Sequence, residues 1–190
     1  IDEEQFPDAN DEYLIYQTLV GACPIGVTGT AWVEPFKQRI TEYILKAARE
    51  SKSHTSWVNK NVEYETAISA FIEKILTVSA TNPFLDDFTN FHNALYPFGL
   101  INSLAQTALK FTSPGVPDIY QGNEIFDFSL VDPDNRRPVD YGERAHMLNR
   151  VNKHIQIGQF GSEQEIAKQA DFLRNCLTEI DDGGCKLLVA

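Results

Sequence analysis

SPGVPDIYQGNEIFDFSLVDPDNRRPVDY, residues 113–141, is the stretch that decides how the fold is interpreted. It opens with a short apolar run at 116–120 that is closed by Gly122, which predicts a buried β-strand. A dense set of Asp, Asn and Arg residues follows. In β/α barrels the loops at the carboxyl ends of the strands carry the chemistry. We therefore expect the functional groups in the twenty or so residues beyond this strand.

Four phrases resemble one protein family and occur in that family's order: DEYLIYQTLVGACP, KAARESKSHTSWVN, SPGVPDIYQGNE and DFSLVDPDNRRPVDY. They resemble maltooligosyltrehalose synthase, a glycoside hydrolase of the α-amylase superfamily, from about residue 11 to about residue 141. The resemblance implies an isomerase of trehalose biosynthesis that turns the reducing-end α-1,4 linkage of a maltooligosaccharide into an α,α-1,1 linkage. In that superfamily the catalytic acids lie on barrel strands four, five and seven. Those strands precede anything in this chain, so the resemblance implies a carboxyl-side fragment with no catalytic residue of its own, which by itself is inactive.

Chain length leads to the same expectation independently. A complete (β/α)8 barrel usually needs about 250 residues, whereas this chain has 190. It begins at Ile1 and ends in an apolar segment, and we expect both ends to be cuts in a longer protein.

Composition excludes several classes of partner. Sixteen basic against twenty-seven acidic residues give a net charge of −11, which repels nucleic acid and anionic membrane surfaces. No run approaches the roughly 20 apolar residues of a membrane span, and no signal pattern opens the chain, so we expect a cytoplasmic protein. Neither the three widely spaced cysteines, Cys23, Cys176 and Cys185, nor the four histidines have metal-ligand spacing. We expect reduced, partly buried thiols, with no cofactor and no metal.

Helical periodicity dominates the rest of the sequence, which predicts a mainly α fold. Two amphipathic stripes are the clearest, one from Phe36 to Ala47 and one from Ile68 to Leu76, the second with Asn61 as its N-cap. A third stripe starts at Phe84 and is expected to end before Pro97, and the apolar segment 100–111 predicts a separate, buried helix. Two further helices follow at 147–155, ended by Gly158 and Gly161, and at 166–177.

The domain organisation expected from these elements has three parts. Residues 12–96 form a helical insertion unit, and 97–157 supply the last helix, strand (116–120) and helix of an incomplete (β/α)8 barrel. Residues 158–190 begin a truncated carboxyl-terminal region. A barrel strand without its neighbours leaves unpaired backbone groups, which predicts either a fragment held by its own helical core or a dimer that covers the exposed surface.

The polar loop offers candidate contacts to a sugar. A guanidinium can donate two hydrogen bonds to vicinal hydroxyls or fix a neighbouring carboxylate, and aromatic faces can stack on pyranose rings. The resemblance places the Asp-Asn-Arg loop at the rim of the sugar site. The expected maltooligosaccharide-binding residues are Asp132, Asn135, Arg136, Arg137, Tyr120 and Phe126.

Each of these roles has an alternative. The loop carboxylates are also typical turn formers, the two aromatic residues could belong to the core, and Arg137 could pair with Asp140 to hold the loop. The family usually has Trp where this chain has Phe126, which removes a hydrogen-bond donor. At the level of the whole chain, the alternatives are a non-catalytic helical binding or assembly module and a fragment of an α-amylase-type hydrolase.

Overall fold

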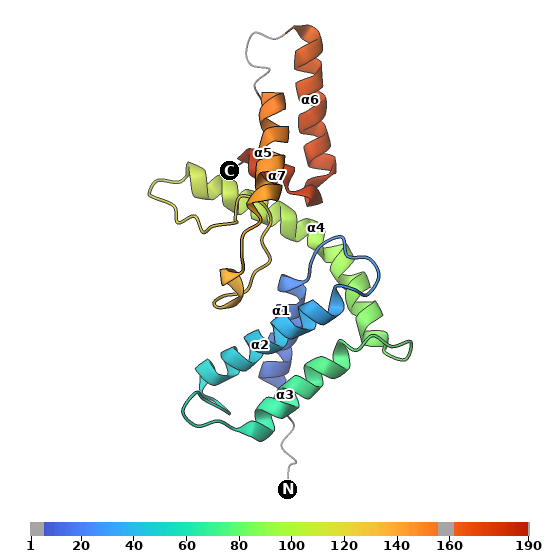
Figure 1. Ribbon diagram of the computed structural model, residues 1–190, viewed down its shortest axis with the longest axis vertical. Coiled ribbons are helices and arrows are strands. Elements are labelled where there is room, and N and C mark those ends of the chain that lie inside the picture. The colour runs from blue at the N-terminus through green and yellow to red at the C-terminus, as the bar shows by residue number, and fades with distance from the viewer. Residues whose placement is uncertain (1–5, 156–161, 190) are drawn as a thin grey trace. The chain divides into compact units, whose positions relative to one another are not determined.

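The structure is a computed structural model that describes residues 6–155 and 162–189, and their regular elements are helices (Figure 1). The predicted mainly α class is therefore confirmed. The chain divides into two compact units: unit 1 comprises residues up to 94 together with 128–137, and unit 2 comprises 95–127 together with 138 onward. The three-part division at residues 12, 97 and 158 stays a prediction.

Unit 1 is built on α1 (Ala9–Ala22), α2 (Val33–Ser51) and α3 (Val62–Ile75), together with the first part of α4 (Pro83–Thr112). α2 and α3 lie side by side, and α1 packs against α2 (Figure 1). Full burial of each large apolar side chain stabilises the fold by about 1.5–3 kcal/mol. The side chains with no exposed surface include Ile15, Leu19, Ile40, Tyr64, Ile68, Ile72 and Leu76. They include Ile40 of the first predicted stripe and Ile68, Ile72 and Leu76 of the second.

Side-chain caps fix where two of these helices begin. Asn61 Oδ1 accepts a hydrogen bond from the Tyr64 amide at 3.1 Å, which confirms the predicted N-cap of α3. Asp8 caps α1 in the same way, because its Oδ1 accepts from the Asp11 amide at 2.8 Å. The sequence analysis did not predict α1 as a separate helix.

The prediction of a helix end before Pro97 is wrong, because α4 runs without a break from Pro83 to Thr112. A proline inside a helix removes one backbone hydrogen bond and crowds the preceding turn. Buried contacts lie on both sides of it: Phe88 is 7% exposed and Leu100 is 1% exposed. The expected burial of 100–111 is also wrong in this structure, where Ile101 and Leu109 are more than half exposed.

Unit 2 contains the rest of α4, then α5 (Tyr141–Ile155), α6 (Glu163–Thr178) and α7 (Gly184–Val189). α5 and α6 lie side by side and α7 contacts both (Figure 1). Short 3-10 helices occur at Ile180–Asp182 in unit 2 and at Asp134–Arg136 in unit 1. The predicted helix stops at Gly158 and Gly161 lie outside the described residues. All three cysteines are free and buried, as expected.

The strand predicted at 116–120 is absent, since the described residues contain no strand. The segment is irregular, and Val116 is 99% exposed. A strand needs a neighbouring strand to accept and donate its backbone hydrogen bonds. Local apolar composition alone cannot supply that neighbour, so the prediction was wrong for the chain by itself.

Candidate functional site

Two side chains of α2 hold the polar loop, defined as residues 128–137, against that helix inside unit 1, and Arg39 makes most of the contacts. Arg39 donates from Nε and Nη2 to the two carboxylate oxygens of Asp134, each at 2.9 Å, and Nη2 also donates to the Phe128 carbonyl at 2.9 Å. The side chains of Arg39 and Asp134 are 18% and 9% exposed. Such a two-pronged pair, largely shielded from water, fixes the direction as well as the distance between its partners.

Asp134 is also the point where the loop folds back on itself. Its Oδ2 accepts from the Leu130 amide at 2.7 Å, and Arg137 lies within 3.3 Å of Oδ1. Burial acts to raise the pKa of Asp134, but the hydrogen bonds from Arg39 and Leu130 outweigh it and hold the pKa below its ordinary value. The carboxylate is therefore ionised at neutral pH and serves as the structural centre of the loop.

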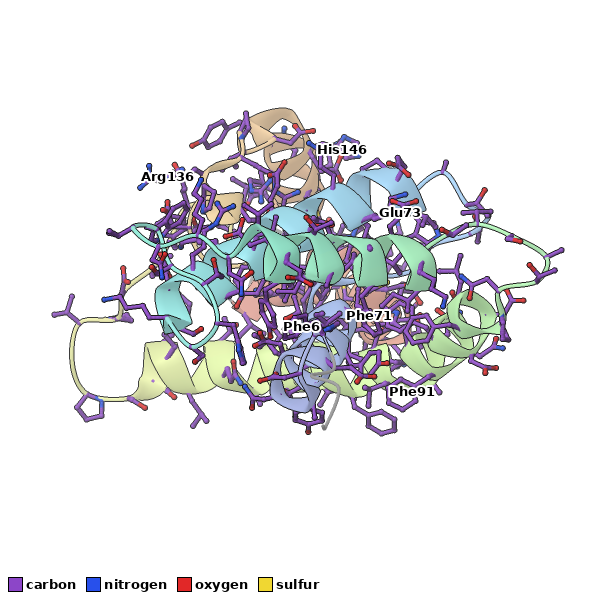
Figure 2. All side chains as sticks on the ribbon, turned by 90° about the horizontal axis from the view of Figure 1, so that it is seen from below. Phe6, Phe71, Glu73, Phe91, Arg136 and His146 are labelled. Atoms are coloured by element: carbon purple, nitrogen blue, oxygen red, sulfur yellow. The ribbon has the colours of Figure 1, made fainter. Side chains whose placement is uncertain are left out.

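The predicted residues Asp132 and Arg136 form an ion pair with each other, and the Asp132 side chain is 48% exposed. The Arg136 side chain is 71% exposed and points away from the helices (Figure 2). The Asp132 carbonyl accepts a hydrogen bond from Lys46 Nζ, which is a second anchor of the loop on α2. Arg136 is thus the more accessible of the two loop arginines.

Arg137 and Asn135 are placed differently. Arg137 Nη2 donates to Ser129 Oγ at 2.9 Å and its Nε donates to the Asp134 carbonyl at 3.1 Å. Asp140, its suggested partner, instead accepts from the Glu143 amide at 2.9 Å at the start of α5. The Asn135 Oδ1 atom is shielded from solvent and has no hydrogen-bond partner within the described residues.

A hollow of about 470 Å³ lies between α2 and the loop. Gln38, Glu42 and Tyr43 line it from α2, and Asp134 and Arg137 line it from the loop. Amide, carboxylate, phenol and guanidinium groups beside one aromatic ring can hydrogen bond to a polyhydroxylated ligand and contact its apolar faces.

The other two predicted residues, Tyr120 and Phe126, belong to unit 2. Tyr120 is 43% exposed. Lys186 Nζ lies 5.5 Å from the centre of the Phe126 ring and donates to the Ile125 carbonyl at 3.0 Å. Burial lowers the pKa of Lys186, which is 7% exposed. The structure therefore groups four of the six predicted residues on one loop and places the other two in a separate unit.

Arg39 and Lys46 are the site residues that the sequence analysis missed. Lys46 also forms an ion pair with Glu50, one turn further along α2, at 3.7 Å. Arg39 carries no local signal, because its partner Asp134 is 95 positions away in the sequence. An alignment of related sequences would be the natural way to find such a pair.

Two general features complete the description of the site. In residues 6–155 and 162–189, no three His, Cys, Asp or Glu side chains gather closely enough to hold a metal ion. Within the same ranges, no helix has the length and apolar character that crossing a bilayer requires.

Comparison with known proteins identifies relatives, although no family model matches the chain. A protein of Mycobacterium tuberculosis strain CDC 1551 that carries the name maltooligosyl trehalose synthase is 38% identical over 145 residues, or 76% of this chain. The corresponding protein of strain H37Rv matches equally well. The match covers 18% of each of these proteins.

Solved structures give the same result. One is a crystal structure of a maltooligosyl trehalose synthase, with a TM-score of 0.74 and 35% identity over 95% of this chain and 21% of the other. Another, the synthase of Arthrobacter ramosus, has a TM-score of 0.68 and 29% identity, over 94% of this chain and 19% of the other. The resemblance inferred from the four sequence phrases is therefore confirmed: the chain is a relative of the maltooligosyl trehalose synthases and corresponds to about a fifth of their length.

Proposed function

We propose that this chain is a carboxyl-side part of a maltooligosyltrehalose synthase and that the 128–137 loop forms part of the wall of its sugar site. The proposal depends mainly on one observation. Arg39 and Lys46 of α2 hold in place a loop rich in hydrogen-bonding groups, while the Arg136 side chain remains exposed to solvent. The similarity to synthases over most of this chain supports the same assignment.

The reaction of the whole enzyme would be an intramolecular transglucosylation. A carboxylate attacks the anomeric carbon of the linkage next to the reducing end. The released glucose stays in its subsite and rotates there. Its own anomeric hydroxyl then attacks the covalent intermediate and forms the α,α-1,1 linkage. Water must be kept out meanwhile, or hydrolysis releases glucose instead. Loop residues at the rim would bind the sugar and close the site, and the last part of the barrel would come from 97–157.

The isolated chain is expected to be inactive. A glycosidase acid must be protonated near neutral pH, which requires a raised carboxyl pKa. In the described part of the chain, the carboxyl pKa values that shift, those of Asp8, Glu65, Asp134 and Glu165, are all lowered. These groups are suited to holding structure as carboxylates and not to donating a proton.

The direct test uses maltopentaose with two proteins, the whole synthase that carries this segment and the 190-residue chain alone. We expect the whole protein to form a non-reducing product with a terminal trehalose unit, and the chain alone to form none. Release of glucose or maltose without that product would instead support the hydrolase alternative. Turnover by the chain alone would contradict the assignment of the catalytic acids to other parts of the protein.

The alternative of an assembly module rests on a separate observation. Phe98, Ile101 and Leu109 of α4 are between 55% and 64% exposed, and apolar side chains exposed in this way favour association. For the isolated chain we propose a homodimer that covers this face. Light scattering with size-exclusion chromatography would test it, and a strictly monomeric chain at about 100 μM would contradict it. The three free, buried thiols fit a reducing compartment, and we propose the cytoplasm.

A further inference from the structure

The polar loop has little regular structure with which to hold itself in place. Its backbone bonds within 128–137 are those of one 3-10 turn, Asp134 N to Val131 O at 3.2 Å, Arg136 N to Pro133 O at 3.0 Å and Arg137 N to Asp134 O at 3.4 Å. Leu130 packs against the core of unit 1, but segments with so few backbone bonds open readily. The position of the loop therefore depends on what anchors it from outside.

Arg39 is the anchor with the most contacts to the loop. Its guanidinium bonds the Phe128 carbonyl at the start of the loop and the Asp134 carboxylate in its second half, three bonds of 2.9 Å from one side chain. Asp134 in turn accepts a hydrogen bond from the Leu130 amide at 2.7 Å, which fixes a third point of the loop. Three points along the loop are thus tied to one position on α2.

Arg39 does not belong to the core of unit 1. The neighbouring residues Phe36, Ile40 and Ile44 face the core and are no more than 2% exposed, whereas Arg39 is directed at the loop. The helix can consequently keep its packing when the arginine is changed. That separation makes a role in positioning the loop distinguishable from a role in stabilising the unit.

We propose that Arg39 is a positioning residue for sugar binding: by fixing Asp134 it sets where Asp132, Asn135 and Arg136 meet the oligosaccharide. The inference rests on the proposed function, because it takes the loop to be part of the sugar site. A displacement of about 1 Å in groups that orient a substrate can cost about 100-fold in rate. A loop freed from α2 would also admit water, so a larger share of turnovers would end in hydrolysis.

The main variant is Arg39→Lys, which keeps the positive charge but loses the two-pronged geometry. Ile40→Val is the matched control, because it trims a fully buried side chain at the next position of α2 and leaves the Arg39 side chain unchanged. Asp134→Asn is a second variant, which weakens the same pair by changing its partner on the loop. Thermal melts would establish that all three variants are folded and would measure how far each is destabilised.

The first arm of the experiment measures hydrogen exchange in the 190-residue chain. We expect the amides of 128–137 to exchange at least about tenfold faster in Arg39→Lys and Asp134→Asn than in Ile40→Val, while the α3 amides exchange no faster in these two variants than in Ile40→Val. Unchanged exchange in the loop would overturn the anchoring role, whatever the enzyme does.

The second arm measures the whole synthase on maltopentaose. In Arg39→Lys we expect kcat/KM to fall at least about tenfold, mainly through KM, and the ratio of glucose to trehalose product to rise, with neither change in Ile40→Val. The double variant Arg39→Lys with Asp134→Asn should lose no more than the worse single variant, because both break one pair. If the wild type is active and Arg39→Lys has the same kcat/KM and the same product ratio as Ile40→Val, the inference is wrong. A wild type that forms no trehalose product would instead refute the proposed function, and the exchange arm would still decide whether Arg39 anchors the loop.

Discussion

The hydrogen bond between Tyr64 and Asp11 gives a sharp prediction about the stability of unit 1. Tyr64 is completely buried, and its hydroxyl donates to Asp11 Oδ2 at 2.5 Å. The residue Asp11 is itself only 9% exposed. The ring packs edge-on against Phe6, with centroids 5.1 Å apart, and stacks with His54 at 4.4 Å. Replacing Tyr64 with Phe would therefore remove the hydroxyl and leave the ring contacts in place.

The magnitude follows from what the change leaves behind. A hydrogen bond to a charged group contributes about 1.5–3 kcal/mol net, and a buried acceptor left without its donor adds to the loss. Burial and the bond to Asp11 both raise the pKa of Tyr64, so the hydroxyl stays protonated and donates throughout the neutral range. We expect Tyr64→Phe to lower the free energy of unfolding of unit 1 by about 2 kcal/mol.

The assay can report on unit 1 alone. The chain has two tryptophans, Trp32 and Trp57, and both belong to unit 1. Urea unfolding followed by tryptophan fluorescence should show the midpoint of Tyr64→Phe lower by about 0.7–2 M, for a slope of about 1–3 kcal/mol per molar. Tyr13→Phe is the control. Tyr13 lies two residues after Asp11 on α1 and is 62% exposed, so this change should alter the free energy of unfolding by less than about 0.5 kcal/mol.

Two results would refute this reasoning. One is a loss in Tyr64→Phe no larger than that in Tyr13→Phe. The other is an equal loss when Tyr64→Phe is introduced into an Asp11→Ala background, which has no side-chain acceptor, since a real bond between these groups requires a coupling energy of about 0.5 kcal/mol or more.

Three further predictions concern an ion pair, a glycine and a thiol. The hydrogen bonds from Arg49 lower the pKa of Glu65 to about 2 against the opposing effect of burial. The stability that this pair contributes is present above about pH 4.5 and is lost as the pH falls toward 2. In Glu65→Gln the free energy of unfolding should therefore fall less steeply with acidification than in the wild type, and an equal slope in the two proteins would contradict this prediction. Gly122 has φ +93°, and a Cβ there would lie 3.2 Å from an arginine nitrogen. Hydrogen exchange should therefore show that Gly122→Ala destabilises unit 2 by about 1–2 kcal/mol. Gly99→Ala is the control and should not destabilise the unit, because a Cβ on this α4 residue would have no atom within 4 Å. Burial raises the pKa of Cys23 to about 12, so this thiol should resist a disulfide reagent at pH 8 until urea unfolds unit 1, and rapid labelling of the native chain would count against its burial.

The sequence was most informative where the signal is local. Apolar residues at helical spacing identified the buried faces of α2 and α3, and Asn61 marked the start of α3 through a bond that spans three residues. These features depend on neighbours within one or two turns of the chain, so a single sequence contains the information that determines them. The four family phrases worked for a similar reason, because each is a short continuous segment.

Tertiary structure decided the features that depend on distant partners. The run at 116–120 has the composition of a strand, but a strand exists only beside another, and none lies beside it in the described residues. Pro97 marks a helix end by local rules, yet α4 continues through it and has buried residues on both sides. Arg39 and Asp134 meet across 95 positions, through a pairing that no local pattern encodes. By itself, the sequence thus determined the buried faces of α2 and α3, the cap of α3 and the family of relatives, because short-range hydrogen bonding and periodicity fix these features. Only the folded chain determined which helix holds the polar loop, because that depends on long-range electrostatic and hydrogen-bond contacts that form once the helices have packed.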